Sequence, residues 1–574
     1  MKLKRVSIEN YRNLNSTNIE FDESCNFIVG ENNIGKTNIL SLFNVIFNRR
    51  GFNYEDFADA TLPILIRISI KLANEEIGHF EDLFDIEDYS NINIICRQVS
   101  PEENMEFFHM ETETYISPSL IKCLNFIYYD SLRNPMSEIS FDSSKGVGRF
   151  LSRMIKDYLS DKEIDINNIM DTNFNHDLLV NINSKLGCIK SFTDYGIQAI
   201  IEGDLSLVFP KLISLKDKKG GALSKCGYGV QFLLLVTLSI LEKLQMIYNQ
   251  RGDSGIFIND KNGERAISMV LGLDEPEIHL HPYMQRSLIK YLNRVINNED
   301  SHLRILIKDL FGIDKFNGQI IIATHSPNII LNDFRQIIRV YKNGEDTNII
   351  SGANLFLGEQ LEKHLLLHFP FIKEAFFARC AIFVEGDSEF GSFPWFAKKC
   401  DIDIDDYGIC IIQAGGDSVL QLIELSEKFG IPCIGIKDSD GDNSPTGVPN
   451  LWKTTKRDFE AELMQLIDDG KEGLLCEILC EYDPKGQERI LSAAAVNKRA
   501  LNKYNYLAVP TTVDLKLSDI DKTDTMKLKA YYSTWFGINK SQPLGLLIGM
   551  KLSKDDIPQI YINVVEYAKN LSIC

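Results

Sequence analysis

The sequence predicts an α/β protein with more than one domain. Its 574 residues exceed the usual size of a single domain. Short apolar runs at 267–273, 318–323, 380–384 and 432–437 alternate with helical segments, an order typical of parallel sheets covered by helices. A further apolar run at 26–30 leads through a glycine-rich loop into a helix, which is the arrangement of a phosphate-binding loop.

The composition is that of a soluble globular chain, with 44% hydrophobic and 25% charged residues. A net charge of −19 means that the surface as a whole repels nucleic acid, so any DNA binding needs a local basic face or bridging metal ions. The twelve cysteines include no C-x-x-C pair, which argues against a zinc site and fits a reducing compartment. We therefore expect a cytoplasmic protein.

Two stretches of the sequence bear on targeting and membrane insertion. Residues 1–14 alternate like a strand, unlike a signal peptide. The apolar run at 229–244 is too short and too interrupted to span a bilayer, and it predicts a buried helix. We expect no membrane partner.

The elements before the first long polar region are expected in a clear order. Strands are predicted at 3–11, 26–30, 63–73 and 122–130, and a helix at 36–50. The alternation at 63–73 is that of a half-buried strand. Between about 146 and 219 the pattern becomes helical and polar, without strong strands, and predicts an insertion.

The loop at 30–37 fits G-x-x-x-x-G-K-[ST] between a strand and a helix. Its two glycines, Gly30 and Gly35, let backbone N–H groups approach phosphates. Lys36 would reach the β- and γ-phosphates, and the Thr37 hydroxyl would bind Mg²⁺. The motif therefore predicts an ATP site.

Two later strands end in residues that suit the same site. The run at 267–273 delivers Asp274 and Glu275 to the edge where ligands bind in parallel sheets. Asp274 would hold Mg²⁺ through water, and Glu275 would polarise the attacking water. His325 follows the strand at 318–323 and would contact the γ-phosphate, whereas a lone histidine at a strand end is usually structural.

A glycine-rich stretch, "LSKCGYGVQ", precedes the long apolar helix. In one interpretation it is a degraded signature loop, in which Ser224, Gly227 and Gly229 face the γ-phosphate of a second subunit. In the other it is only the glycine-rich start of a helix.

Taken in order, these motifs resemble the ABC-type ATPase heads of RecF, Rad50 and SMC proteins. The N-terminal "IENYRNL" also resembles the start of such heads, where the arginine, here Arg12, approaches the nucleotide; a clear Q-loop glutamine is missing. The resemblance implies ATP held between two heads of a homodimer. The residues expected to bind ATP and its ion are Arg12, Gly30, Asn33, Gly35, Lys36, Thr37, Asn38, Ser224, Gly227, Gly229, Asp274 and His325.

Acidic residues follow two apolar strands in the second half of the chain. Glu385, Asp387 and Glu389 come after the strand at 380–384, and a second strand ends in "KDSDGD" at 437–442. If these strands are parallel neighbours, their carboxylates meet at one sheet edge, where like charges are unfavourable unless cations bind. Mg²⁺ or Mn²⁺ would then align a phosphodiester and activate water. The alternative for 438–442 is a solvated acidic turn. An EF-hand calcium loop is disfavoured, because the sequence that follows lacks the glutamate that such a loop requires.

This order resembles a Toprim domain. The resemblance carries Glu385 over as the Toprim glutamate and Asp438 and Asp440 as its D-x-D pair, with Glu389 as the further acidic position of the nuclease group. An ABC-type head followed by a Toprim domain resembles the OLD (overcoming lysogenization defect) nuclease family over nearly the whole chain.

Three further site residues follow from the OLD resemblance. "RDFEAEL" offers Glu460 and Glu462 as metal ligands, and "INKSQPLGLLIG" offers Lys540 to stabilise the transition state. The domains implied are a first ATPase part at 1–145, a helical dimerisation insertion at 146–219, a second ATPase part at 220–370 and a Toprim nuclease domain at 371–574.

The function expected is that of an ATP-binding, Mg²⁺- or Mn²⁺-dependent DNA endonuclease, gated by nucleotide or by a partner. The resemblance implies a homodimer or tetramer and a role in bacterial anti-phage defence. The partner would be the helicase-like protein of Gabija systems or a retron reverse transcriptase with its non-coding RNA and DNA, unless the chain is a solitary OLD nuclease. Two alternatives remain open: a RecF- or SMC-like ATP-dependent clamp without nuclease activity, or another Toprim enzyme, which the missing zinc ribbon and cleavage domain disfavour.

Overall fold

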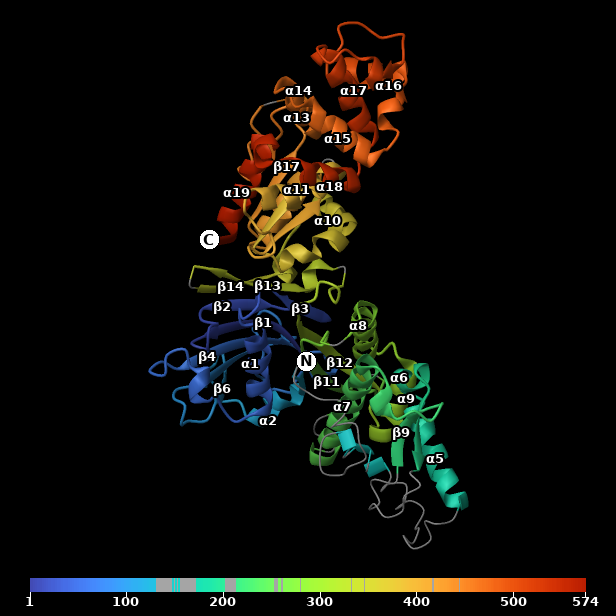
Figure 1. The fold of residues 1–574 in the computed structure, drawn as a ribbon. Coiled ribbons are helices and arrows are strands. Elements are labelled where there is room, and N and C mark those ends of the chain that lie inside the picture. Colours follow the sequence, from blue (N-terminus) through green and yellow to red (C-terminus); the bar gives the residue numbers. More distant parts are fainter. Residues whose placement is uncertain are drawn as a thin grey trace. The chain divides into compact units, whose positions relative to one another are not determined.

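The computed structural model forms two compact units, Met1–Asn354 and Leu355–Cys574 (Figure 1). It describes residues 1–130, 147–148, 150–151, 153–154, 172–201, 213–251, 256–259, 262–278, 280–331, 333–344, 346–415, 418–442 and 444–573. The second unit begins ahead of residue 371 because helix α10 (Glu359–Ile372) packs against helices and strands of that unit.

The first unit contains an antiparallel sheet that pairs strands close in the sequence. Its strands, in spatial order, are β2 (Thr17–Glu20), β1 (Lys2–Glu9), β4 (Ile64–Lys71), β5 (Asn91–Gln98) and β6 (Glu106–His109). Strand β4 alternates strictly between buried and half-buried side chains, as its sequence predicts. The buried face joins the apolar core that also receives helix α1 (Lys36–Asn48).

The second sheet of this unit carries the predicted parallel strands. Its strands, in spatial order, are β10 (Phe257–Ile258), β11 (Arg265–Asp274), β12 (Lys315–Ala323), β3 (Cys25–Val29), β13 (Ile337–Asn343) and β14 (Asp346–Ser351), and β7 (Phe126–Tyr129) also pairs with β11. Strands β11, β12, β3 and β13 run parallel, so their carboxyl ends share one edge. That edge receives the loops after β3, β11 and β12, which hold the predicted ATP motifs.

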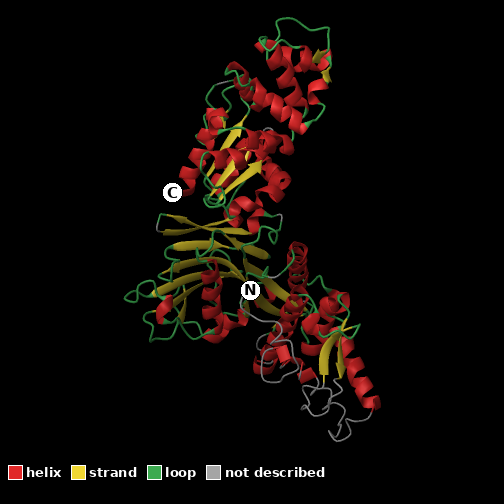
Figure 2. Ribbon diagram, in the orientation of Figure 1, coloured by secondary structure: helices red, strands yellow, loops and turns green. Residues whose placement is uncertain are grey.

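Helices cover this sheet, as Figure 2 shows in red. The helices of the unit include α7 (Tyr228–Arg251), α8 (Pro282–Ile296) and α9 (Ser301–Phe311) besides α1, and α2 (Pro118–Ile121) is a single turn. Among the described residues, Gly229–Asn249 is long and apolar enough to cross a membrane, and 67% of its most apolar window is buried. The helix is longer than its sequence suggested, but its burial agrees with the predicted core helix.

The region expected to be a helical insertion without strong strands contains a strand pair besides helices where it is described. It contains helices α5 (Thr172–Leu186) and α6 (Lys190–Asp194), and an antiparallel pair formed by β8 (Ile197–Ile201) and β9 (Ile213–Asp217). The prediction was wrong here because "IQAII" is short and pairs with a strand several residues away, which leaves no tight-turn signal. Residues 146, 149, 152, 155–171 and 202–212 of this region lie outside the described residues.

The second unit is built on a parallel four-stranded sheet. The strands, in spatial order, are β16 (Ile409–Gln413), β15 (Cys380–Val384), β17 (Cys433–Lys437) and β18 (Leu451–Lys453). Every residue of β15 is buried, which explains its continuous apolar run. Helices α11 (Asp387–Lys399) and α19 (Gln559–Ile573) share a core with one face, and Gly435 of β17 admits α12 (Ser418–Lys428) against the other. The predicted parallel sheet with covering helices is thus confirmed.

Further short elements extend this unit beyond the sheet. They are α13 (Phe459–Leu463), α14 (Gln465–Asp468), α15 (Glu472–Tyr482), α16 (Ala493–Val496), α17 (Thr525–Ile538), α18 (Gln542–Lys551), and the strand pair β19 (Ile490–Leu491) and β20 (Leu515–Lys516). Trp535 of α17 is fully buried in their shared core.

Helices α11 and α18 approach each other closely because both carry glycines at the contact. A Cβ atom at Gly391 would lie 2.2 Å from the Gln542 carbonyl oxygen, and one at Gly545 would lie 2.1 Å from the Ser388 carbonyl oxygen. The contact fixes the start of α18, and with it the preceding Lys540, against the helix that carries Glu389.

Substituting Gly545 with alanine is expected to destabilise the protein by about 1–3 kcal/mol, because the added methyl group overpacks this contact. Gly473→Ala in α15 is the matched control: a Cβ there meets no atom within 4 Å, so alanine should raise helix stability by about 0.5–1 kcal/mol. Thermal melting compares the two. Equal melting temperatures would contradict the close helix contact.

Candidate functional site

The loop between β3 and α1 has the backbone geometry of a phosphate cradle. Gly30 and Gly35 adopt φ angles of 141° and 111°, which favour glycine. A Cβ at Gly30 would also lie 2.1 Å from the Val340 carbonyl oxygen of β13. Asn33 is left-handed as well, with φ of 59°. These positions turn the loop tightly over the start of α1.

Lys36 lies inside this loop. Its Nζ donates to the carbonyl oxygens of Gly30 (2.9 Å) and Glu31 (2.6 Å) and lies 3.3 Å from His325 Nδ1. Burial lowers the pKa of Lys36 to about 8, against the opposing effect of Glu275 and other nearby carboxylates. A bound phosphate would supply the anion that stabilises this ammonium group.

The structure brings the two predicted ion-binding groups together. The Thr37 hydroxyl donates to Asp274 Oδ1 at 3.0 Å. Burial raises the pKa of Asp274 to about 6, a shift that a cation would reverse. Both groups come from the shared sheet edge, through α1 and β11.

Glu275 and His325 also meet at this edge. His325 Nε2 lies 2.8 Å from Glu275 Oε1, and burial together with Lys36 lowers the pKa of His325. Glu275 has a φ of 46°, which is uncommon for a residue other than glycine and is typical of functional loops. Its position agrees with the predicted water-polarising role, which stays a prediction.

Sequence reasoning missed Glu277, which positions the histidine loop. Its Oε1 accepts hydrogen bonds from the His325 N–H and the Thr324 hydroxyl, each at 2.6 Å. The second glutamate of "DEPE" was the available signal.

Arg12 is held at the loop by two polar partners. Its Nη1 donates to Asn38 Oδ1 at 2.6 Å, and its Nε and Nη2 donate to Asp56 Oδ1 at 3.0 and 2.8 Å. Asn13, which sequence reasoning missed, donates to the Ile34 carbonyl oxygen of the loop at 2.7 Å. The predicted nucleotide-binding residues Arg12 and Asn38 therefore lie together.

The stretch with two possible interpretations lies at the start of α7. Ser224 falls in a short turn, and its side chain lies outside the described part. Gly227 is exposed, and a Cβ there would meet no atom within 4 Å. Gly229 is buried, and a Cβ there would lie 2.8 Å from both Leu280 and Met284. Packing within the chain thus accounts for Gly229, and contact with a second subunit stays a prediction.

A second site lies at the carboxyl edge of the sheet in the second unit. Strands β15 and β17 are parallel neighbours, with Val384 opposite Ile436. Glu385 follows β15, and its Oε2 accepts the Asp438 backbone N–H at 2.9 Å. The two acidic loops therefore meet as the sequence predicts.

Three buried carboxyl oxygens at this edge lack a hydrogen-bond partner among the described residues: Glu389 Oε2, Asp438 Oδ1 and Glu460 Oε1. Burial raises the pKa of Glu389 to about 8, and Asp438 and Glu460 raise it further while Lys540 opposes them. Burial likewise raises the pKa of Asp438 to about 7. We call Glu389, Asp438, Glu460 and Lys540 the acidic cluster.

Lys540 supplies the positive charge of the acidic cluster. Its Nζ lies 2.7 Å from Glu460 Oε2. Burial disfavours the ammonium form, but Glu460 more than compensates and raises the pKa of Lys540 above its usual value. The lysine therefore stays charged beside carboxyls that hold protons near neutral pH.

Three other acidic residues are placed differently. Asp440 is exposed, with a left-handed φ of 49°. Glu462 is bound to its own loop, because its carboxylate accepts from the Thr455 hydroxyl and the Lys456 N–H, both at 2.7 Å. Asp387 is half-buried, and its Oδ1 accepts a hydrogen bond from Gln413 Nε2 at 3.1 Å.

Sequence reasoning missed two buried residues beside the acidic cluster. Asp458 caps α13 and accepts from Lys503 Nζ and the Tyr504 hydroxyl, both at 2.6 Å. The Tyr561 hydroxyl, fully buried, has no partner among the described residues, and burial with Glu389 nearby raises its pKa well above the usual value. Tyr561 sits in an apolar helix pattern, which gave no sign of a polar role.

The acidic cluster has the donor chemistry that a hard divalent cation requires, because its unpartnered oxygens are carboxylates. In the part of the chain that the structure describes, no three His, Cys, Asp or Glu side chains lie close enough to hold a metal as they stand. A cation would thus have to draw these carboxylates together, with Glu385 and Asp440 at the rim.

We expect the stabilisation by Mg²⁺ to grow from about pH 6 to about pH 8. The folded-state pKa values of Glu389 and Asp438, about 8 and about 7, lie above their unfolded values of about 4. The metal-free fold therefore loses stability as pH rises through this window, while a cation binds the ionised carboxylates. Melting temperatures with Mg²⁺ and with chelator measure the difference. An increment that is independent of pH would contradict metal binding at these carboxyls.

The fold and the two sites define an ABC-type ATPase head joined to a Toprim domain. Residues 1–186 and 128–330 match the family profile described as AAA ATPase domain, and residues 376–440 match "Overcoming lysogenization defect protein-like, TOPRIM domain". The chain belongs to this AAA ATPase domain family, and it carries an OLD-like Toprim domain.

The chain is also similar to individual proteins, over most of its length or over its C-terminal part. The chain is 21% identical over 478 residues to Endonuclease GajA of Bacillus cereus (strain VD045), covering 77% of this chain and 75% of the relative. It is 23% identical over 550 residues to Endonuclease GajA of Bacillus cereus (strain HuB5-5), with 77% of each chain covered. The C-terminal region of the Xanthomonas campestris pv. campestris OLD protein aligns with a TM-score of 0.23 and 20% identity, over 35% of this chain and 96% of that one.

Proposed function

We propose that this chain is an ATP-binding, metal-dependent DNA endonuclease of the OLD type. The observation that carries the proposal is the acidic cluster: buried, unpartnered carboxylates with a charged lysine at the carboxyl edge of a parallel sheet. Such a cluster is costly to bury without a cation, and perturbed carboxyls of this kind mark functional sites. Two relatives named as endonucleases, each aligned over 77% of the chain, support the same function.

The residues of the second unit would divide the chemistry among them. Mg²⁺ or Mn²⁺, when bound, supplies charge neutralisation on the phosphodiester and a more acidic attacking water. Glu385, Glu389, Asp438, Asp440 and Glu460 would hold it. Lys540, fixed by Glu460, would stabilise negative charge on the phosphate and the leaving oxygen. We do not assign Glu462 to this set, because its carboxylate is committed to Thr455 and Lys456.

The first unit would bind ATP as a control element. Lys36 and Arg12 would contact phosphates, Thr37 and Asp274 would hold Mg²⁺, and Glu275 would polarise water. ATP held between two such heads would make a homodimer, and a tetramer by further association, and would fix the spacing of paired nuclease sites. Anti-phage defence with a helicase-like or retron partner is the biological setting that we propose.

A second candidate is a RecF- or SMC-like ATP-dependent clamp without nuclease activity. It is favoured by the lack of a preformed group of three metal-binding side chains among the described residues.

Plasmid cleavage separates the two candidates. We expect the chain to nick or linearise supercoiled plasmid in Mg²⁺ or Mn²⁺, and Asp440→Ala to reduce the rate by about 100-fold. Melting temperatures establish that the variant is folded. Absence of cleavage by the unsubstituted chain in either ion, with and without ATP, favours the clamp.

A further inference from the structure

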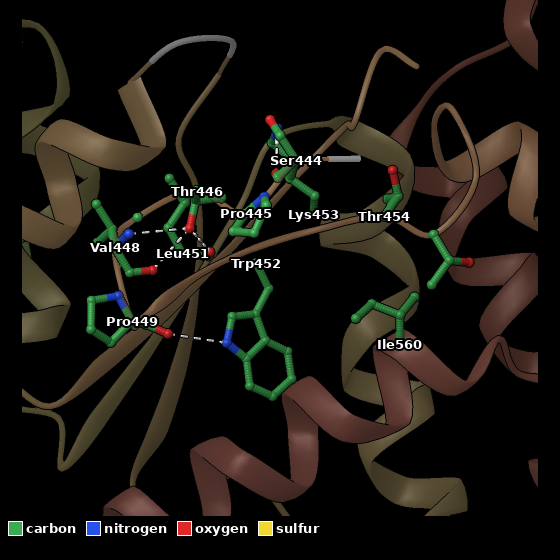
Figure 3. Close-up of a pocket in the computed structure, with 12 residues that line it drawn as sticks. Ser444, Pro445, Thr446, Val448, Pro449, Leu451, Trp452, Lys453, Thr454 and Ile560 are labelled. Carbon is green, nitrogen blue, oxygen red and sulfur yellow. Dashed lines mark hydrogen bonds between the residues drawn. The ribbon is translucent and has the colours of Figure 1, made fainter. Parts of the chain in front are cut away.

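The second unit contains a pocket of about 720 Å³, lined by residues 444–449, 451–455 and Ile560 (Figure 3). Its wall is continuous with the D-x-D loop, because Thr454 Oγ1 accepts the Ser439 N–H at 3.0 Å. The adjacent Thr455 hydroxyl donates to Glu462 at 2.7 Å. Ser439 directly follows Asp438, so the pocket wall is hydrogen-bonded to the loop that carries one residue of the acidic cluster.

Hydrogen bonds make the wall of the pocket rigid. The Thr446 hydroxyl lies 3.0 and 2.7 Å from the carbonyl oxygens of Val448 and Leu451 (Figure 3). Trp452 Nε1 donates to the Pro449 carbonyl oxygen at 3.2 Å, and the Trp452 ring lies 5.2 Å from the Tyr567 ring. The indole is thus fixed with its N–H engaged, so its ring surface is what it offers to a ligand.

The lining favours a flat and weakly polar ligand. It includes no carboxylate, and its one charged side chain is Lys453. The Lys453 ammonium is already neutralised, because it donates to Asp442 Oδ2 and the Asp442 carbonyl oxygen at 2.9 Å. The pocket therefore offers no carboxylate to a metal ion, and its lysine is already paired and not available to a free anion. The rest of the lining combines Trp452 and apolar side chains with the hydroxyl side chains of Ser444, Thr446, Thr454 and Thr455. A nucleobase can stack on an aromatic ring such as that of Trp452.

We propose that this pocket receives a nucleobase of the DNA strand that is held at the acidic cluster, stacked on Trp452. The proposal rests on the proposed DNA-cleaving function, and it adds a positioning contact. Seating a base beside the cluster would set which phosphate lies over the carboxylates. Stacking accepts any base, so the contact would fix the position of the strand more than its sequence.

The test measures binding of a short single-stranded oligonucleotide and of versions with one abasic position moved along it. The protein is the full chain with Asp440→Ala, in Mg²⁺. We expect one abasic position to weaken binding about tenfold, and Trp452→Leu to cause the same loss with the intact oligonucleotide. At that abasic position Trp452→Leu should cause no further loss. Trp452→Phe should retain binding, and Phe371→Leu, an exposed aromatic residue outside the pocket, should leave it unchanged.

Two results would overturn the proposal. One is unchanged affinity in Trp452→Leu, which would point to a protein segment as the occupant. The other is an equal loss with intact and abasic oligonucleotides, which would show a structural effect. If Trp452→Leu does not fold, base-dependent quenching of tryptophan fluorescence decides: it must occur with Trp452 and disappear in Trp452→Phe.

Plasmid cleavage by the unsubstituted chain keeps the two hypotheses apart. Cleavage together with Trp452-independent oligonucleotide binding rejects the base pocket alone. Trp452-dependent binding without any cleavage supports the pocket and rejects the nuclease.

Discussion

Replacing Glu389 with glutamine is expected to lower metal-dependent DNA cleavage by more than about 100-fold and, at the same time, to stabilise the metal-free fold at alkaline pH. The side chain is buried, with a pKa of about 8, so above that pH the fold holds a buried carboxylate that Lys540 stabilises only in part. Because the unfolded-state pKa is lower, the cost appears as pH rises towards about 8 and is full above it. Glutamine keeps the volume and removes the charge, which should raise stability by about 2–4 kcal/mol at about pH 9.

Melting with chelator across pH, together with plasmid cleavage in Mg²⁺, measures both effects. Glu424→Gln, at an exposed position on α12, is the matched control and should change neither. A variant that loses cleavage but melts like the unsubstituted chain at every pH would argue against a buried, charged Glu389. One that cleaves normally would remove it from the metal site.

Lys36→Ala is expected to weaken ATP binding by about 100-fold and to abolish any effect of ATP on DNA cleavage. Lys36 supplies the buried ammonium group of the phosphate loop, and hydrogen bonds from charged groups contribute about 1.5–3 kcal/mol each. Nucleotide titration and cleavage at several ATP concentrations measure the two effects. Lys290→Ala, exposed on α8, serves as control. The same ATP response in the unsubstituted chain and in Lys36→Ala would exclude gating by nucleotide bound at this phosphate loop.

The parts of the fold that the sequence predicted are those with local signals. A fully buried strand such as β15 requires a continuous apolar run, and acidic residues directly after β15 and β17 must meet if the strands are neighbours. The phosphate loop is similarly specified by glycines whose φ angles and close contacts exclude larger residues.

The site residues that the sequence did not predict are those whose roles depend on contacts between segments distant in the sequence. Nothing local marks Tyr561 as facing the acidic cluster, or Asp458 as the partner of Lys503. Glu460 and Glu462 illustrate the limit. They lie two positions apart in the five-residue helix α13, yet one meets Lys540 and the other binds its own loop. A helix of this length has no apolar stripe from which the orientation could be predicted.

The hydrogen bond from the Asp438 N–H to Glu385 has a consequence for how tolerant position 385 is of change. The Glu385 side chain links the segments that follow β15 and β17, and it lies next to Asp438 of the acidic cluster. Aspartate is shorter by one methylene group, so its carboxylate would not reach the Asp438 N–H. Alanine would leave that N–H without its hydrogen-bond acceptor. Glutamine alone would keep an acceptor for the Asp438 N–H while removing the charge, so we expect few substitutions at position 385 to be tolerated.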